Sequence, residues 1–571
     1  MGFRHVLGAS ALLCGVVAVT ATHPATAATS TASTSTYVVL ADTPESMAAA
    51  EAAVIAAGGT VTGRNQAIGM ITARADGLAF AEQVRGVTGV AGVASDRSIG
   101  KAPKRNDGAA QDLADAKAAA SAAGSPVVSA AADHGDGKDA RAPEPLADKQ
   151  WDMKMIGATA DGSYAEEQGS RKVRVGIIDT GVDGTHPDIK PNFSYSLSRN
   201  FVTDNAIYGD GDVCEHPSCV DPVDEDDDGH GTHVAGTIGA AINGLGMAGV
   251  APKVTLVNIR AGQDSGYFLL DSTINALTYA GDAGIDVVNM SFYVDPWLFN
   301  CASNPADSPA DQAEQRAIIT GMQRALRYAR SHGVTLVSAL GNSNFNYDDK
   351  ASLVDLSSPD FPYQTAYPRP VQGDCLDLPT MGDGVIGTIS VGPSTKKADY
   401  SNWGSTYGEV SAPGGYFRDW FGTANYRSVD NLILAPYPEN LAIANGDLDA
   451  DGNPNTPFVV KDCKGTTCAY YQYLQGTSMA SPHAAGVAAL IVSKYGEQRR
   501  GGFGLSPDKV ARILFATASK TPCPADPVIV YPDRSAKYTA TCVGTAELNN
   551  IYGHGIVNAL SAVSGDDHEH D

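Results

Sequence analysis

Short apolar runs alternate with longer amphipathic stretches from about residue 149 to the end of the chain. The apolar runs are rich in β-branched residues and are typical of parallel strands covered on both faces. They lie at 173–178, 254–259, 286–290, 335–339 and 386–391. Helical stretches lie between and after them, at 272–283, 313–332, 479–495 and 507–518. This alternation predicts an α/β fold with an open, mostly parallel sheet and helices on both faces.

A smaller unit is predicted at 36–98, where the pattern is different. Strand-like runs at 36–40, 61–64, 70–73 and 90–94 are interrupted by helical stretches at 45–57 and 77–84. The order β-α-β-β-α-β is that of a ferredoxin-like unit.

Three segments are expected to lie outside both folded units. Residues 1–28 have a short basic start, an apolar stretch and the small-residue pattern Ala25-Thr26-Ala27, which together predict a secretory signal peptide. A lipoprotein anchored through Cys14 is a weaker alternative, because two leucines precede the cysteine. Residues 99–148 are rich in Ala, Asp, Lys and Gly and predict a solvated linker. The acidic tail at 563–571 is expected to be disordered.

Composition narrows the function. Of the 571 residues, 43% are hydrophobic and 18% charged, as in a globular protein, and the formal net charge is −24. Nucleic-acid binders need a basic surface, so we expect no nucleic-acid partner. No run after the predicted signal peptide approaches the length of a transmembrane helix, so we also expect no membrane partner.

Eight cysteines remain once the predicted signal peptide is excluded, an even number that suggests disulfides in an exported chain. Short spacings favour the pairs Cys214–Cys219, Cys463–Cys468 and Cys523–Cys542, which leaves Cys301 for Cys375. Some of these thiols could instead be free, and none of the spacings is that of a zinc site.

Three polar segments carry candidate chemistry. Asp179 ends the apolar run at 173–178, where functional groups collect in open α/β sheets. His230 begins the small-residue segment GHGTHVAGT at 229–237, and Ser478 lies at a helix start in GTSMASPH at 476–483. Each residue alone has a structural alternative: a loop cap for Asp179, packing or a metal pair with His233 for His230, and an N-cap for Ser478. The three in the order Asp, His, Ser match the order of the subtilisin triad.

With these residues the chain resembles the subtilisin-like serine proteases. Further matching segments are IIDTGVDGTHPD at 177–188, VVNMS at 287–291, SALGNS at 338–343 and YGHGIVNA at 552–559. The resemblance covers about 150–560, and the region before it resembles the family's inhibitory prodomain. It implies the domain order 1–28 signal peptide, 29–98 prodomain, 99–148 linker with the maturation site, and 149–562 peptidase domain.

The resemblance also implies roles for individual residues. Ser478 would be the nucleophile, His230 its base, and Asp179 the group that orients the imidazole. Asn342 stands where the family places its oxyanion donor; the alternative is a plain turn residue after Gly341.

Substrate would be bound, by the same resemblance, by two segments: Ser291, Phe292 and Tyr293 on one side, and Ala339, Leu340 and Gly341 on the other. Here the sequence departs from the family, because Phe292-Tyr293-Val294 replaces the usual Leu-Gly-Gly. The bulk of Tyr293 is expected to narrow the cleft and to restrict specificity.

Two insertions suggest a structural calcium ion. The acidic stretch 204–228 leads to His230 and could bind calcium, attract basic peptides, or be a solvated loop. In the second, at 415–471, Asp447, Asp449 and Asp451 have the spacing that opens a calcium loop, although residue 458 is Phe where such a loop has an acid. A polar loop with Asx turns is the alternative there.

Together these features predict a secreted, extracellular serine endopeptidase that cleaves protein or peptide substrates and is made as a self-processed precursor. Its own prodomain would be an intramolecular inhibitor, calcium the only and purely structural cofactor, and the mature protein a monomer. Two alternatives remain: a maturation protease dedicated to one exported peptide, and a catalytically inactive relative used for binding.

Overall fold

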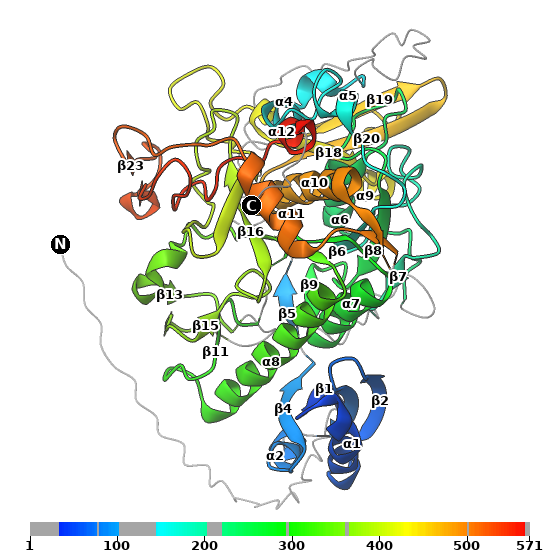
Figure 1. Ribbon diagram of the computed structural model, residues 1–571, viewed down its shortest axis with the longest axis vertical. Coiled ribbons are helices and arrows are strands. Elements are labelled where there is room, and N and C mark those ends of the chain that lie inside the picture. Colours follow the sequence, from blue (N-terminus) through cyan, green and yellow to red (C-terminus); the bar gives the residue numbers. More distant parts are fainter. Residues whose placement is uncertain are drawn as a thin grey trace, which may run out of the picture.

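The computed structural model describes residues 34–76, 79–96, 98–101, 144–202, 220–292, 296–359, 365–499 and 502–565 (Figure 1). The predicted signal peptide, Cys14, most of the predicted linker, Cys214, Cys219, Tyr293 and the end of the tail lie outside these residues. In the part of the chain that is described, no helix is both long enough and apolar enough to cross a membrane.

The main domain is built on a seven-stranded sheet in which every pair of neighbours is parallel, with the order β17-β16-β12-β10-β6-β8-β7. The predicted open parallel α/β fold is thus confirmed. Its strands are β6 (Arg174–Ile178), β7 (Arg199–Asn200), β8 (Thr255–Arg260), β10 (Val287–Met290), β12 (Thr335–Ala339), β16 (Val385–Val391) and β17 (Gly408–Pro413).

Helices bury both faces of this sheet. On one face, α6 (His230–Gly239), α10 (Thr477–Tyr495) and α11 (Pro507–Thr517) share a core with the strands, together with α4 (Trp151–Ile156) and α12 (Ala559–Ser564). On the other face lie α7 (Leu270–Asp282) and α8 (Pro309–Ser331). Full coverage explains why the central strands β6, β10 and β12 are mostly apolar in sequence.

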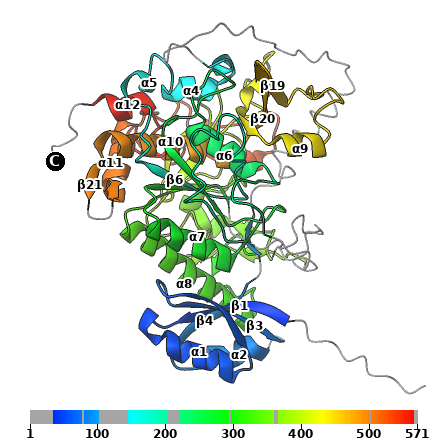
Figure 2. The ribbon, with the colours of Figure 1, turned by 90° about the vertical axis from the view of Figure 1, so that its right-hand side faces the viewer.

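The N-terminal unit has the predicted ferredoxin-like order, with the antiparallel sheet β2-β3-β1-β4 and two helices. Its elements are β1 (Thr34–Ala41), α1 (Met47–Ala56), β2 (Thr60–Asn65), β3 (Met70–Asp76), α2 (Ala79–Arg85) and β4 (Val90–Ser95). The unit packs against α7 and α8, at the bottom of the molecule in Figure 2.

Both ends of the predicted linker belong to the folded structure. β5 (Ser98–Lys101) leaves the N-terminal unit and pairs antiparallel with β9 (Tyr267–Leu269) of the main domain (Figure 1). At the other end, Leu146 is buried and its N–H donates to the Gly246 carbonyl at 2.8 Å. The described residues at the two ends of the predicted 99–148 linker, 99–101 and 144–148, thus belong to the folded part of the chain.

The second insertion folds into a small antiparallel sheet, β18-β20-β19, with the short helix α9 (Glu439–Ala444). Its strands are β18 (Ile433–Tyr437), β19 (Val459–Lys464) and β20 (Thr467–Leu474). Cys463–Cys468 closes the β19–β20 hairpin, and Cys301–Cys375 and Cys523–Cys542 are also formed. These three predicted disulfides are confirmed.

Candidate active site

Asp179 and His230 are in direct contact at the carboxyl end of β6. The Asp179 side chain is fully buried, and its Oδ1 lies 2.7 Å from His230 Nδ1. The same oxygen accepts the Thr180 N–H at 2.9 Å. An ionised carboxylate can only accept, so Nδ1 carries the proton and Nε2 is left with its lone pair. His230 Nε2 is buried and has no hydrogen-bond partner among the described residues.

Small residues allow helix α6 to approach β6 this closely. A Cβ on Gly231 would lie 2.0 Å from the Gly181 carbonyl oxygen and 3.0 Å from Asp179 Cβ. Any larger residue would therefore push α6 away from the sheet and lengthen the bond between Asp179 and His230.

Two further carboxylates lie beneath the start of α6, in the stretch where the sequence left a solvated acidic loop as an alternative. Asp226 is 1% exposed. Its Oδ1 accepts from Gly229 N–H at 2.9 Å and its Oδ2 from the Thr232 N–H and hydroxyl at 2.9 and 2.6 Å. Asp226 therefore caps the helix instead of facing solvent. Asp228 Oδ1 accepts the His230 N–H at 3.2 Å.

These carboxylates set the charge around the imidazole. Burial lowers the pKa of His230, but the charge and hydrogen bond of Asp179, together with Asp228 and Asp226, outweigh burial and raise the pKa above its usual value. Burial raises the pKa of Asp228 to about 7, and the neighbouring Asp226 charge acts in the same direction. The site is therefore electrostatically prepared to stabilise an imidazolium.

Ser478 is the second residue of α10 and is 1% exposed. Its hydroxyl donates to the Ser291 carbonyl at 3.1 Å rather than to His230 Nε2. Asp179 and His230 are thus hydrogen-bonded to each other. Ser478 lies at the N-terminus of α10, and its hydroxyl is hydrogen-bonded to the backbone of Ser291. Of the two contacts of the predicted triad, the one between Ser478 and His230 is not formed in this arrangement.

Asn342 is held rigidly beside Ser478. Its Oδ1 accepts both the N–H and the hydroxyl of Thr477 at 2.9 Å, so the amide Nδ2 points the other way. Thr477 Oγ1 in turn accepts the Gly341 N–H at 3.0 Å. Gly341 has φ +103°, and a Cβ there would lie 2.4 Å from Asn402 Nδ2, so the turn requires glycine.

The positioning roles of Thr477 and Asn402 were not predicted from the sequence. Asn402 Oδ1 accepts the N–H groups of Ser343 and Phe345 at 3.0 and 2.9 Å, and its Nδ2 donates to the Leu340 carbonyl at 2.9 Å. Thr477 lies inside the motif at 476–483 and could have been found there. Asn402 is distant in sequence and carries no such signal.

The segments predicted to bind substrate flank Ser478, but several of their side chains are turned inward. Ser291 Oγ donates to the Ser478 carbonyl at 2.9 Å, and Phe292 stacks on Phe268 with ring centroids 4.0 Å apart. Leu340 is fully buried with Tyr347. Ala339 and Gly341 are also buried. Tyr293 lies outside the described residues.

The structure does not gather Asp447, Asp449 and Asp451 into one site. Asp447 Oδ2 accepts from the Tyr437 hydroxyl at 3.1 Å, whereas Asp449 Oδ1 accepts the N–H groups of Asp451 and Asn453 in an Asx turn. The loop corresponds to the Asx-turn alternative because its carboxylates face different partners.

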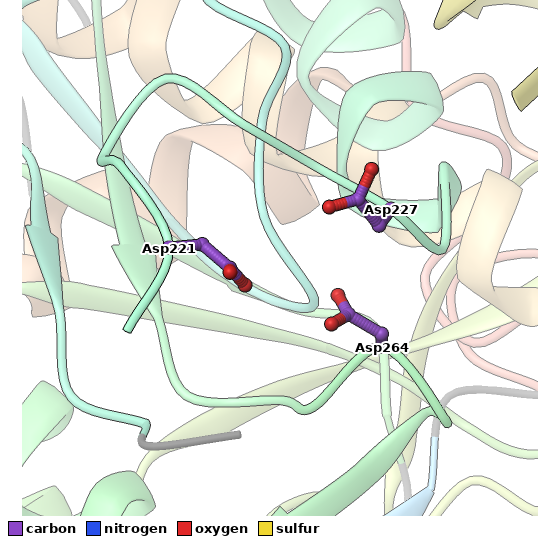
Figure 3. Close-up of side chains that lie close together, drawn as sticks. All are labelled: Asp221, Asp227 and Asp264. Carbon is purple, nitrogen blue, oxygen red and sulfur yellow. The ribbon is translucent and has the colours of Figure 1, made fainter. Parts of the chain in front are cut away.

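A different acidic cluster is present near α6. Asp221, Asp227 and Asp264 point toward one another in Figure 3, and among the described residues they form the one group of three potential ligands within 4.8 Å. The Arg260 guanidinium is ion-paired to Asp221 and, at 2.9 Å, to Asp264. Carboxylate oxygens are typical calcium ligands, but two of these three carboxylates are already ion-paired with Arg260.

Comparisons with known proteins agree with the family that the sequence resembles. Residues 170–555 match the family model of the subtilase family. The nisin leader peptide-processing serine protease NisP of Lactococcus lactis subsp. lactis is 31% identical over 371 residues, covering 64% of this chain and 46% of that protein. Subtilisin DY of Bacillus licheniformis is 27% identical, covering 63% of this chain and 88% of that protein. This chain thus spans about half the length of NisP.

Among solved structures, the epidermin leader peptide processing serine protease EpiP of Staphylococcus aureus has a TM-score of 0.61 at 21% identity. The match covers 94% of this chain and all of that chain, and it supports the fold. The family model extends over more than half of the sequence, across Asp179, His230, Asn342 and Ser478. The chain therefore belongs to the subtilase family of serine proteases.

Proposed function

We propose that this chain is a serine endopeptidase in which Asp179, His230 and Ser478 form the catalytic triad. The observation that carries the proposal is the 2.7 Å contact between Asp179 and His230 Nδ1, which leaves Nε2 available as a base. The order Asp, His, Ser of the three motifs assigns Ser478 as the residue that gives its proton to His230 Nε2. Its hydroxyl must turn from the Ser291 carbonyl toward Nε2 before it can lose its proton.

The reaction then follows from the positions of these groups. Ser478 Oγ attacks the peptide carbonyl while His230 accepts its proton, and Asp179 stabilises the imidazolium that forms. Asn342 Nδ2 and the Ser478 N–H donate to the developing oxyanion; loss of one such donor costs about 10²–10³ in kcat. His230 returns the proton to the leaving amine, and water later hydrolyses the acyl-enzyme.

The substrate class that we favour is a specific exported peptide rather than proteins in general. Two relatives are described as leader peptide-processing proteases, NisP and EpiP. A general secreted scavenger is the second candidate, supported by the similarity to subtilisin DY.

We further propose that residues 29–98 are an inhibitory prodomain of an exported, monomeric enzyme. Asn65 Nδ2 donates to Thr278 Oγ1 on α7 at 2.7 Å, and Arg324 on α8 donates to the Ala41 carbonyl at 2.7 Å. The strand β5 adds to β9 as an extended peptide substrate would. Maturation would then cut the chain between residues 101 and 144, after which the fragment can leave.

Calcium would have a secondary role. The cluster of Asp221, Asp227 and Asp264 could hold an ion for stability alone, and Arg260 would compete with the ion for two of these carboxylates. We therefore expect binding to be weak.

The proposed function is tested with the substitution Ser478→Ala in the full precursor. The variant should fold, since Ala fits a helix N-terminus, but it should stay unprocessed because no nucleophile remains. N-terminal sequencing after expression in a protease-deficient host gives the answer. Processing of the variant at the wild-type position would contradict the proposal.

A further inference from the structure

Asp377 is a buried carboxylate for which the mechanism above has no use. It follows β15 (Cys375–Leu376) and is 1% exposed. Its Oδ2 accepts a hydrogen bond from the Tyr347 hydroxyl. Its Oδ1 is buried and has no hydrogen-bond partner in the described part of the chain. No ion pair of Asp377 with an Arg, Lys or His is found among the described residues.

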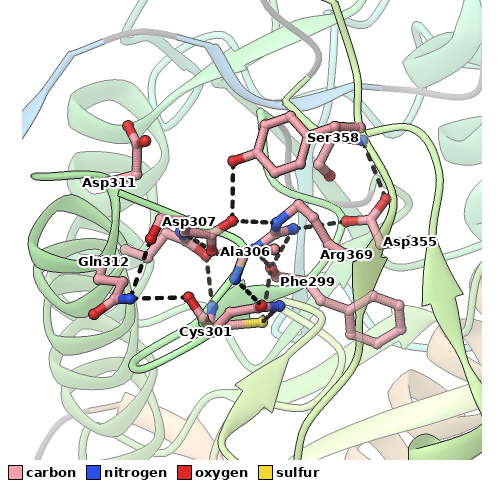
Figure 4. Close-up of polar contacts among 12 residues, drawn as sticks. Phe299, Cys301, Ala306, Asp307, Asp311, Gln312, Asp355, Ser358 and Arg369 are labelled. Carbon is pink, nitrogen blue, oxygen red and sulfur yellow. Dashed lines mark hydrogen bonds and ion pairs between the residues drawn. The ribbon is translucent and has the colours of Figure 1, made fainter. Parts of the chain in front are cut away.

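Other buried carboxylates of this region are neutralised within the chain. Arg369 is completely buried and binds Asp307 through Nε at 2.7 Å and Asp355 through Nη1 at 2.7 Å (Figure 4). Arg369 also lies over the Trp297 ring at 4.6 Å. The charge of Asp355 raises the pKa of Asp377, but Asp377 forms no ion pair with Arg369.

Other carboxylates also keep one oxygen without a hydrogen bond among the described residues. Asp179, Asp152 and Asp533 are each paired with a histidine or an arginine through the other oxygen, whereas the half-buried Asp227 accepts from the Asn440 amide at 2.7 Å. Asp377 differs because it combines full burial with a neutral partner, Tyr347. Burial raises the pKa of Asp377 to about 7, the Tyr347 bond lowers it, and the Asp355 charge raises it.

Asp377 lies next to the segment that the sequence places along the specificity pocket. Tyr347 OH, its hydrogen-bond donor, is also 3.2 Å from the Leu340 carbonyl oxygen. Thr380, three residues after Asp377, donates to the Ala339 carbonyl at 2.7 Å. The carboxylate is thus one hydrogen-bonded side chain away from the backbone of 339–341, which leads directly to Asn342.

Burial of a carboxylate lowers the stability of the fold unless a cation neutralises the carboxylate or it is protonated. A buried carboxylate without a cation in the chain can instead pair with a cation that a ligand supplies. We infer that Asp377 is the specificity-determining residue of this protease and that it binds the Lys or Arg side chain of the residue on the acyl side of the cleaved bond. This inference rests on the proposed function and refines it to processing after a basic residue.

The chain's own maturation region contains suitable residues. Lys101, Lys104 and Arg105 follow the N-terminal unit in the sequence, and Arg141 precedes the start of the packed main domain. Self-processing is therefore expected after one of the Lys or Arg residues in the stretch from 101 to 143.

The test compares mature wild type, Asp377→Asn and Asp383→Asn on peptides that differ only at the residue before the cleaved bond: Arg, Lys, Leu or Phe. Asn can still accept from Tyr347, so Asp377→Asn should fold and melt at or above the wild-type temperature. Its kcat/KM ratio for Arg over Leu should fall about 100-fold, mostly through the loss of a buried charge pair with the substrate. Asp383→Asn removes an exposed carboxylate that pairs with Arg327, and it should keep the ratio within about threefold.

The outcomes are distinct. An unchanged Arg-to-Leu ratio in Asp377→Asn, or a wild-type preference for Leu or Phe, overturns the inference while leaving the proposed function intact. A melting temperature that falls by many degrees with an unchanged ratio assigns Asp377 to a structural role through Tyr347. An inactive wild type that also fails to react at Ser478 with a fluorophosphonate contradicts the proposed function itself.

Discussion

The buried carboxylates Asp179, Asp226 and Asp377 differ in the groups that bind them. On the β6 side, Asp226 is satisfied by donors from its own loop and helix, and Asp179 is paired with His230. Beside the segment 339–341, Asp377 accepts from the neutral Tyr347 hydroxyl, and its second oxygen has no hydrogen-bond partner among the described residues. Asp179 thus has its counter-charge within the chain, whereas the inference above assigns the counter-charge of Asp377 to the substrate.

Under the two proposals above, this difference separates a catalytic carboxylate from one that selects the substrate. Groups that act in every turnover gain from rigid partners, because a preorganised site needs no rearrangement as charge develops. A group that selects substrate gains from an unmet electrostatic requirement, because only the correct side chain meets it. The substitutions below test which role each carboxylate has.

The largest effect is expected for Asp179→Asn. The amide cannot hold the Nδ1 proton as the carboxylate does, so the imidazole takes the wrong tautomer and kcat should fall by about 10⁴. Asp383→Asn is the matched control, because Asp383 is an exposed carboxylate paired with Arg327. Steady-state kinetics on one peptide measures both. A loss of less than tenfold in Asp179→Asn would mean that Asp179 does not orient His230.

Asp226→Ala is expected to act on stability before chemistry. It leaves the Gly229 and Thr232 N–H groups without their buried acceptor, at a cost of about 2–3 kcal/mol. Urea unfolding in a Ser478→Ala background avoids self-digestion. Asp451→Ala, at an exposed position, should change the free energy of unfolding by less than about 0.5 kcal/mol. Equal effects of the two substitutions would show that Asp226 does not cap α6.

Asp96 represents a third case, a carboxylate beside a like charge. It lies between the N-terminal unit and α7, where Oδ1 accepts the Asp271 N–H at 3.0 Å. Burial, and then the Asp271 charge, raise the pKa of Asp96 to about 8. The docked state therefore binds a proton, and docking should weaken as the pH rises from about 4 through 8.

After processing, the N-terminal fragment should consequently separate several-fold faster at pH 9 than at pH 6. Asp96→Asn removes the titrating group and should flatten this dependence, which gel filtration of the processed chain can follow. The same slope in wild type and variant would assign the pH dependence to other groups.

The smallest effect is expected on removal of calcium. Because Arg260 already neutralises Asp221 and Asp264, excess EDTA should lower the melting temperature of the Ser478→Ala variant by less than about 2 °C. A drop of ten degrees, restored by calcium, would show that a tightly held ion stabilises the domain.

Local pattern was sufficient to predict most of the fold. The predicted strand at 335–339 coincides with β12, and the Ser506-Pro507 signal marks the start of α11. The sheet β18-β20-β19 was missed because it lies in an insertion, where alternation over a few residues does not distinguish a strand from a loop.

The site was predictable only where chemistry coincides with a motif. Asp179, His230, Asn342 and Ser478 lie in short recognisable segments. Asp226 looks like its acidic neighbours in sequence, and only the fold buries it. Asp377 and Asn402 are held by contacts with segments distant in sequence, so neither period nor spacing could identify them.

The central claim is that Ser478 is a nucleophile activated by His230 and Asp179. The most direct measurement is reaction of the folded protein with a fluorophosphonate, followed by mass spectrometry of the intact chain and its peptides. One adduct is expected, on Ser478, and it should form far more slowly in Asp179→Asn and be absent after prior heat unfolding. Adducts spread over several serines, or an equal rate in Asp179→Asn, would contradict it.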